Sequence, residues 1–76
     1  MEKELVEYIA SNLVNDTDAV RVKARKNGGT LVLHLNVAKG DMGRVIGKQG
    51  RVANAIRSLL KATASRKDIR VVLDID

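Results

Sequence analysis

The chain has 76 residues, of which 14 are Lys or Arg and 9 are Asp or Glu, so its net charge is +5 and its isoelectric point is about 10.0. This length allows one domain with a small core, and the excess of cations favours a polyanionic partner. Because there is no cysteine and a single histidine, we expect no disulfide, no metal site and a cytoplasmic location.

The first segment, residues 2–14, is predicted to form an amphipathic helix. Its apolar residues recur at helical spacing; they are Leu5, Val6, Ile9, Ala10, Leu13 and Val14. The charged residues Glu2, Lys3 and Glu4 argue against a signal peptide or an anchor at this end. No apolar run approaches membrane-spanning length, so we expect no membrane partner.

Two strands joined by a hairpin are predicted next. In the first strand Val20, Val22 and Ala24 alternate with Arg21, Lys23 and Arg25. Asn27-Gly28-Gly29 is a strong hairpin signal, because positive φ is cheap at these positions. The second strand, residues 30–37, should direct its apolar alternate positions at the core: Leu31, Leu33, Leu35 and Val37.

The second half of the chain is predicted to contain two helices and a last strand. Asp41 is a plausible N-cap for a short helix through Ile46, a glycine loop follows, and a longer helix runs over about residues 51–64. A third strand covers residues 69–75. Since this strand returns through two helices, it should lie parallel to the second strand, while the first two are antiparallel. The expected fold class is α+β, with a three-stranded mixed sheet covered on one face by helices.

The tetrapeptide Gly47-Lys48-Gln49-Gly50 is the segment of the chain best suited to bind a polyanion. Neither end of this turn has a Cβ, so the backbone can take up positive φ and approach a polyanion closely. The helix that follows begins with free N–H groups and its positive dipole end. A Walker A loop is excluded by Met42 and Gln49, and the glycine spacing does not fit a dinucleotide fingerprint.

The stretch from Asp41 to Ile56 reads DMGRVIGKQGRVANAI and resembles the GxxG region of KH domains, which clamp four backbone nucleotides of single-stranded RNA. The element order helix-strand-strand-helix-GxxG-helix-strand is that of a type II KH domain. The resemblance thus covers residues 1–76 as one domain, with the strand-helix-GxxG-helix-strand core at about 29–76. The chain is similar to small bacterial stand-alone KH proteins of the KhpA family.

The resemblance implies a role for each residue of the motif. The four residues Gly47–Gly50 would contact the sugar-phosphate backbone, and Arg44 and Arg51 would strengthen the positive field. Gly43 would let a strand pass close to the first helix. Ile46 would belong either to the apolar floor under the bases or simply to the core.

The resemblance also implies a non-enzymatic single-stranded RNA-binding protein, an RNA chaperone or post-transcriptional regulator linked to cell shape. We expect no catalytic residue at His34, no cofactor and no small-molecule substrate. With Tyr8 as the one aromatic residue, the base-stacking platforms of other RNA-binding folds are excluded. Single-stranded DNA remains an alternative ligand, because the loop grips phosphates common to both. The cations of the first strand are either a protective charged edge or an auxiliary RNA contact.

The long helix has a wider apolar stripe than one sheet contact requires. Its surplus flank consists of Ala55, Leu59 and Ala62, and is covered either by another chain or by the N-terminal helix. The resemblance implies pairing as a homodimer, or as a heterodimer with a larger KhpB (Jag-like) KH protein. In the alternative view, the chain is mainly an assembly subunit and its glycine loop is vestigial.

Overall fold

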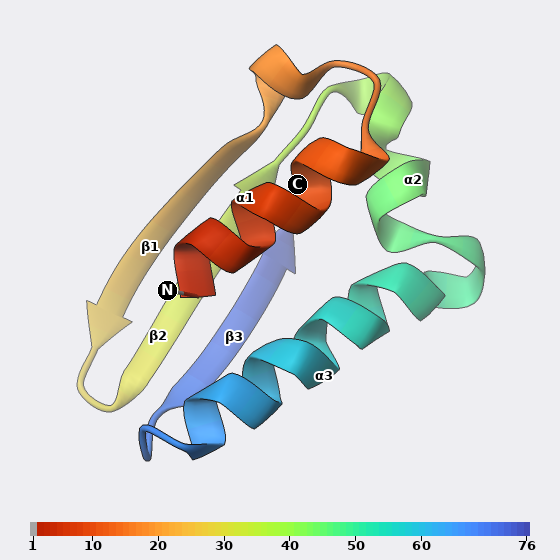
Figure 1. Ribbon diagram of the computed structural model, residues 1–76. Coiled ribbons are helices and arrows are strands. Elements are labelled where there is room, and N and C mark those ends of the chain that lie inside the picture. The colour runs from red at the N-terminus through yellow and green to blue at the C-terminus, as the bar shows by residue number, and fades with distance from the viewer. Residues whose placement is uncertain (1) are drawn as a thin grey trace.

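The computed structural model describes residues 2–76, and the order of its elements is the predicted one (Figure 1). Its helices and strands are α1 (Glu2–Leu13), β1 (Arg21–Asn27), β2 (Thr30–Asn36), α2 (Met42–Ile46), α3 (Arg51–Ser65) and β3 (Arg70–Ile75). Three short 3-10 turns, η1 (Thr17–Ala19), η2 (Lys39–Asp41) and η3 (Lys48–Gly50), complete the described chain. None of the helices in residues 2–76 combines the length and the apolar content that crossing a membrane requires.

The three strands form one mixed sheet in the order β1-β2-β3. The pair β1 and β2 is antiparallel, with Val22 opposite Leu35, and the pair β2 and β3 is parallel, with Leu33 beside Leu73. Figure 1 shows the helices on one side of this sheet, so its other face carries no helix. The α+β class, the mixed pairing and the single covered face are therefore confirmed.

The core lies between this sheet and the helices. Leu33 and Leu35 of the central strand are fully buried, because β2 has a neighbour on each side and helices above it. Ile56 and Leu60, one helical turn apart, dock α3 on the sheet, as their spacing predicts. Each such side chain contributes about 1.5–3 kcal/mol on burial.

The far half of β1 departs from the prediction. Ala24 was expected to face the core but is exposed, and Val22 is the one buried residue of this strand. β1 is an edge strand, so Ala24 has a neighbouring strand on one side only, whereas its partner Leu33 on the central strand is fully buried.

Two buried carboxylates fix the ends of α1. Asp41 was expected to cap α2, but no side-chain cap hydrogen bond forms there. Its carboxylate instead accepts the backbone N–H groups of Asn15 and Asp16, both at 3.1 Å. At the other end, Lys67 Nζ lies 3.1 Å from the buried Glu2 carboxylate. The two N–H donors, aided by the Arg44 guanidinium, hold the pKa of the Asp41 carboxyl below its ordinary value.

Candidate nucleic-acid interface

The glycine loop is a corner of unusual backbone between α2 and α3. Gly47 has φ 77° and ψ 172°, a combination that is essentially confined to glycine. Gln49 (φ 58°) and Gly50 (φ 75°) follow in the left-handed region. The corner projects away from the sheet at the edge of the molecule (Figure 1). A ligand can thus reach its backbone from solvent.

The two glycines are needed for different reasons. A Cβ added at Gly47 would lie 2.5 Å from Val52 Cγ2 and 2.8 Å from Val52 N, so the start of α3 fills that space. A Cβ added at Gly50 would meet only Asn54 Nδ2, at 3.8 Å. Gly47 therefore lets the corner close on itself, whereas Gly50 leaves open space on its outer side.

The charges of the corner favour an anion. Lys48 and Arg51 are exposed, and neither forms an ion pair with any residue in the described part of the chain. No side chain caps the N-terminus of α3, so first-turn N–H groups of this helix keep donors for a ligand. Two cations and a helix N-terminus thus converge where the backbone is most accessible.

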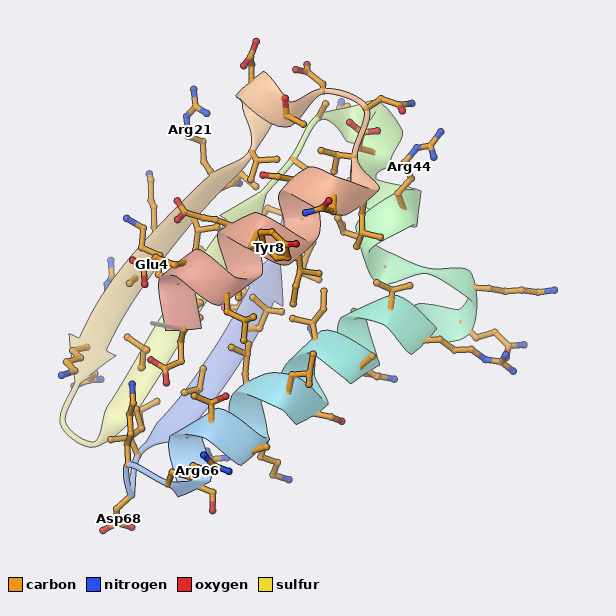
Figure 2. All side chains as sticks on the ribbon, in the orientation of Figure 1. Glu4, Tyr8, Arg21, Arg44, Arg66 and Asp68 are labelled. Atoms are coloured by element: carbon orange, nitrogen blue, oxygen red, sulfur yellow. The ribbon has the colours of Figure 1, made fainter. Side chains whose placement is uncertain are left out.

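Arg44 and Gly43 differ from their expected roles. Arg44 Nε lies 3.5 Å from Asp41 Oδ1, and its side chain points away from the corner (Figure 2). Its charge is therefore partly neutralised by Asp41. At Gly43 an added Cβ would meet nothing within 4 Å. The expected close approach of a strand at Gly43 is therefore wrong. Ile46 is half-buried and packs against the core cluster.

Sequence reasoning missed a cleft that begins about two helical turns past the corner, at Arg57. It runs between α3 and the edge strand β3, has a volume of about 540 Å³, and combines an aliphatic floor with basic side chains. The aliphatic lining includes Ala64, Ile69, Val71, Val72 and Leu73, and the basic lining is Arg57, Lys61 and Arg70. These residues give the site room for bases farther along α3 than the loop that could hold the phosphates.

A polar stripe on α3 connects the corner to this cleft. Asn54 lies beside Gly50 and accepts a 3.5 Å hydrogen bond from Arg57 Nη1. Arg57 also donates to the carbonyl of Leu73 on β3, through Nη2 at 3.1 Å and Nε at 3.4 Å. Lys61 follows four residues later. The spacing of three and four residues from Asn54 to Lys61 places all three on one helix face, and is the signal that could have revealed them.

Comparisons with known proteins agree with this geometry. The family described as "KhpA/KhpB, KH domain" matches residues 3–75. The chain belongs to this family of KH domains. The resemblance noted in the sequence is therefore confirmed over almost the whole chain.

Relatives of this family member carry the name "RNA-binding protein KhpA", and three of them illustrate the similarity. The protein of Halalkalibacterium halodurans is 51% identical over 73 residues, which cover 96% of each chain. That of Caldanaerobacter subterraneus subsp. tengcongensis is 49% identical over 72 residues, covering 95% of this chain and 96% of its own. That of Chlamydia trachomatis serovar D is 45% identical over 73 residues, covering 96% of this chain and 94% of its own.

The surplus flank of α3 is open in this KH-domain family member. Leu59 is 53% exposed, and Ala55 and Ala62 are exposed. A shallow hollow of about 380 Å³ lies between α1 and this flank, lined by Leu5, Leu59, Ala62, Thr63 and Arg66. The alternative that α1 covers the flank within one chain is not met, because Leu59 remains half-exposed.

The chain's one aromatic residue and its one histidine lie outside the corner and the cleft. Tyr8 is 70% exposed on α1 (Figure 2). His34 Nδ1 lies 3.8 Å from Asp74 Oδ2 on the helix-free face of the sheet. No aromatic side chain lines the cleft, so its apolar surface is aliphatic.

Proposed function

We propose that this chain is a non-enzymatic, cytoplasmic RNA-binding protein that grips the backbone of single-stranded RNA at Gly47–Gly50. The observation that carries the proposal is the exposed, unpaired pair Lys48 and Arg51 at the uncapped start of α3. The names of its relatives support RNA as the ligand. The whole of residues 1–76 would act as one KH module.

In this mechanism phosphates and bases use different parts of the site. The phosphates lie at the corner, where Gly50 leaves space and Lys48, Gln49 and the N–H groups of α3 donate hydrogen bonds. The bases turn into the cleft and lie on aliphatic side chains, while Asn54 and Arg57 offer hydrogen-bonding groups to their edges. Because stacking on aromatic rings is absent, the affinity of one site should be modest.

The direct test is the double substitution Lys48→Asp with Gln49→Asp. Two carboxylates would then face the phosphates from an exposed loop, and we expect RNA affinity to fall by about a hundredfold. A matched control, Lys3→Asp with Ser11→Asp, makes the same charge change on exposed positions of α1 and should retain most of the affinity. Unchanged affinity in the loop variant, with an unchanged melting temperature, would remove the loop from the site.

The salt dependence measures how many phosphates are held. Contact with about four phosphates of a single strand gives a slope of log affinity against log salt near −3. Equal affinity for ribose and deoxyribose oligonucleotides of one sequence would favour single-stranded DNA as an equal ligand. A slope near zero would contradict a mechanism led by phosphates.

We further propose that Ala55, Leu59 and Ala62 form an interface with a second copy or with a KhpB (Jag-like) KH protein. The resulting dimer would act as a post-transcriptional regulator or RNA chaperone linked to cell shape. Leu59 is exposed, so Leu59→Asp should leave the fold intact and give a monomer by sedimentation velocity, since a carboxylate is costly to desolvate in an interface. RNA affinity should fall as well, because two linked sites gain avidity. Partner binding without measurable RNA affinity would favour the assembly-subunit alternative.

A further inference from the structure

The helix-free face of the sheet is strongly basic. Alternate residues of β1, including Lys23 and Arg25, point to this face, and strand pairing places Arg70 of β3 on the same side. All three are exposed. Arg21 also lies here, although its Nη1 donates to the carbonyls of Asp18 and Val20. We call this surface the open face.

A small apolar centre lies between these cations. Arg25, Val32 and Val72 are consecutive across the three strands, and both valines are half-buried. Arg25 and Arg70 flank the valine pair, with Cα atoms roughly 12 Å apart by strand geometry. Asp74 is the one carboxylate that the strands bring to the open face, and it lies beside His34. The open face thus carries the positive charge that a polyanion-binding surface needs. Its apolar centre could contact an apolar group of the ligand.

The open face is continuous with the cleft. Because β3 is an edge strand, two of its residues belong to both surfaces. Arg70 and Val72 are among the residues that line the cleft, and the strand register places them on the open face. A ligand that leaves the cleft over β3 therefore arrives directly at Val32 and Arg25.

We propose that the open face is a second RNA-binding surface, on which a single strand held at the glycine loop continues after crossing β3. This inference rests on the proposed function of the loop. Lys23 and Arg25 are two residues apart, about 6.7 Å along the strand, a spacing comparable with that of successive phosphates in an extended single strand. The footprint of one chain would then be longer than the four nucleotides of the loop.

RNA fits these observations better than a membrane or an acidic protein. A membrane-binding face needs apolar side chains that protrude into lipid, whereas Val32 and Val72 are half-buried between longer cations. An acidic protein would not need the continuity with the cleft. That continuity is what a flexible strand, already bound at α3, can use.

The test is the length dependence of RNA affinity. Wild type, Lys23→Gln with Arg25→Gln, and the control Lys3→Gln with Lys39→Gln are titrated with oligoribonucleotides of about four and about twelve nucleotides, one and three times the clamp of the loop. All of these positions are exposed. On the longer strand we expect the open-face variant to bind about fivefold more weakly than wild type and the control, with a salt slope shallower by about 1.4. On the shorter strand the three proteins should bind alike.

Each contrary result points to a different failure. If RNA affinity rises equally from the shorter to the longer strand in wild type and in the open-face variant, the open-face proposal is overturned. If Leu59→Asp abolishes that rise in affinity, the rise is due to dimer avidity instead. Equal loss in the control variant assigns the effect to net charge. Binding of the open face to vesicles rich in anionic lipid, with no length dependence for RNA, assigns it to a membrane. If Lys48→Asp with Gln49→Asp binds the shorter strand as wild type does, the loop proposal fails separately.

Discussion

The chain contains two exposed turns built on glycine, and each turn needs its glycine for a different reason. In the β1–β2 hairpin, Gly28 has φ 63° and an added Cβ would meet nothing within 4 Å. In the α2–α3 corner, Gly47 also has positive φ, but an added Cβ would penetrate Val52. The hairpin thus requires only a conformation, whereas the corner requires both a conformation and an empty space.

This difference separates a turn that reverses the chain from one that can hold a ligand. At the hairpin, a Cβ added at Gly28 or Gly29 would find open space. The corner is backed by Val45, which is fully buried, and by Val52, which packs against the core. In the proposed mechanism this backing would hold the N–H groups and cations of the corner in place before RNA arrives, which would reduce the entropy cost of binding.

The largest effect should come from Gly47→Ala. Strain in a backbone region confined to glycine and overpacking against Val52 together should cost about 3 kcal/mol of unfolding free energy. Gly28→Ala, which meets only the cost of positive φ, should lose about 1 kcal/mol. Urea denaturation of the two variants measures both values. Equal losses would show that Val52 moves aside easily, and the comparison of the two turns would then be wrong.

The anchoring of the corner through α2 is tested by Asp41→Asn. The pKa of Asp41 is lowered in the folded chain by the N–H groups of Asp16 and Asn15. Its stabilising effect is therefore fully present above the unfolded pKa of about 3.9 and is lost as pH falls through the lower folded pKa. We expect Asp41→Asn to melt below wild type at neutral pH and the gap to close on acidification below about pH 4. Asp18→Asn, on an exposed carboxylate of η1, is the control. A gap that stays constant with pH would show that packing, and not charge, carries the effect.

The smallest effect is expected from Gln49→Gly. Gln49 has φ 58°, and relief of the left-handed strain, less the added freedom of the unfolded chain, should stabilise the fold by about 0.5 kcal/mol. The corner should also become less ordered, so RNA affinity should fall a few-fold. Asp68→Gly is the matched control, since Asp68 has φ 55° outside the site and should change stability alone. A destabilised Gln49→Gly variant would show that the glutamine side chain, and not its backbone, matters to the corner.

Features set by local periodicity were predictable from the sequence. The alternation in β2 places Leu33 and Leu35 inside, and the helical spacing of Ile56 and Leu60 directs α3 at the sheet. The glycine loop could also be found, because its residues are adjacent in the chain. In each case the information lies within a few neighbouring residues.

Features set by distant contacts were not predictable in this way. The local sequence predicts that the carboxylate of Asp41 is an N-cap, yet its N–H donors lie just after α1, 25 and 26 positions earlier. Ala24 continues a correct alternation, but its exposure depends on β1 lying at the edge of the sheet. The cleft beside Arg57 needs β3 to be placed next to α3. Packing between elements decides these cases, and one sequence does not encode it in a local pattern.

The parallel pairing of β2 with β3 decides when the binding corner can form as the chain is made. The hairpin closes over two residues and forms within about 10 μs, but Thr30 pairs with Arg70, forty positions later. At about 5–20 residues per second, a ribosome needs several seconds to synthesise that interval. The glycine loop is completed at Gly50, twenty residues before Arg70, so it exists for about one to four seconds without β3 paired behind it. In a nascent chain the hairpin can therefore form early, whereas the proposed RNA-binding corner gains its packed sheet last.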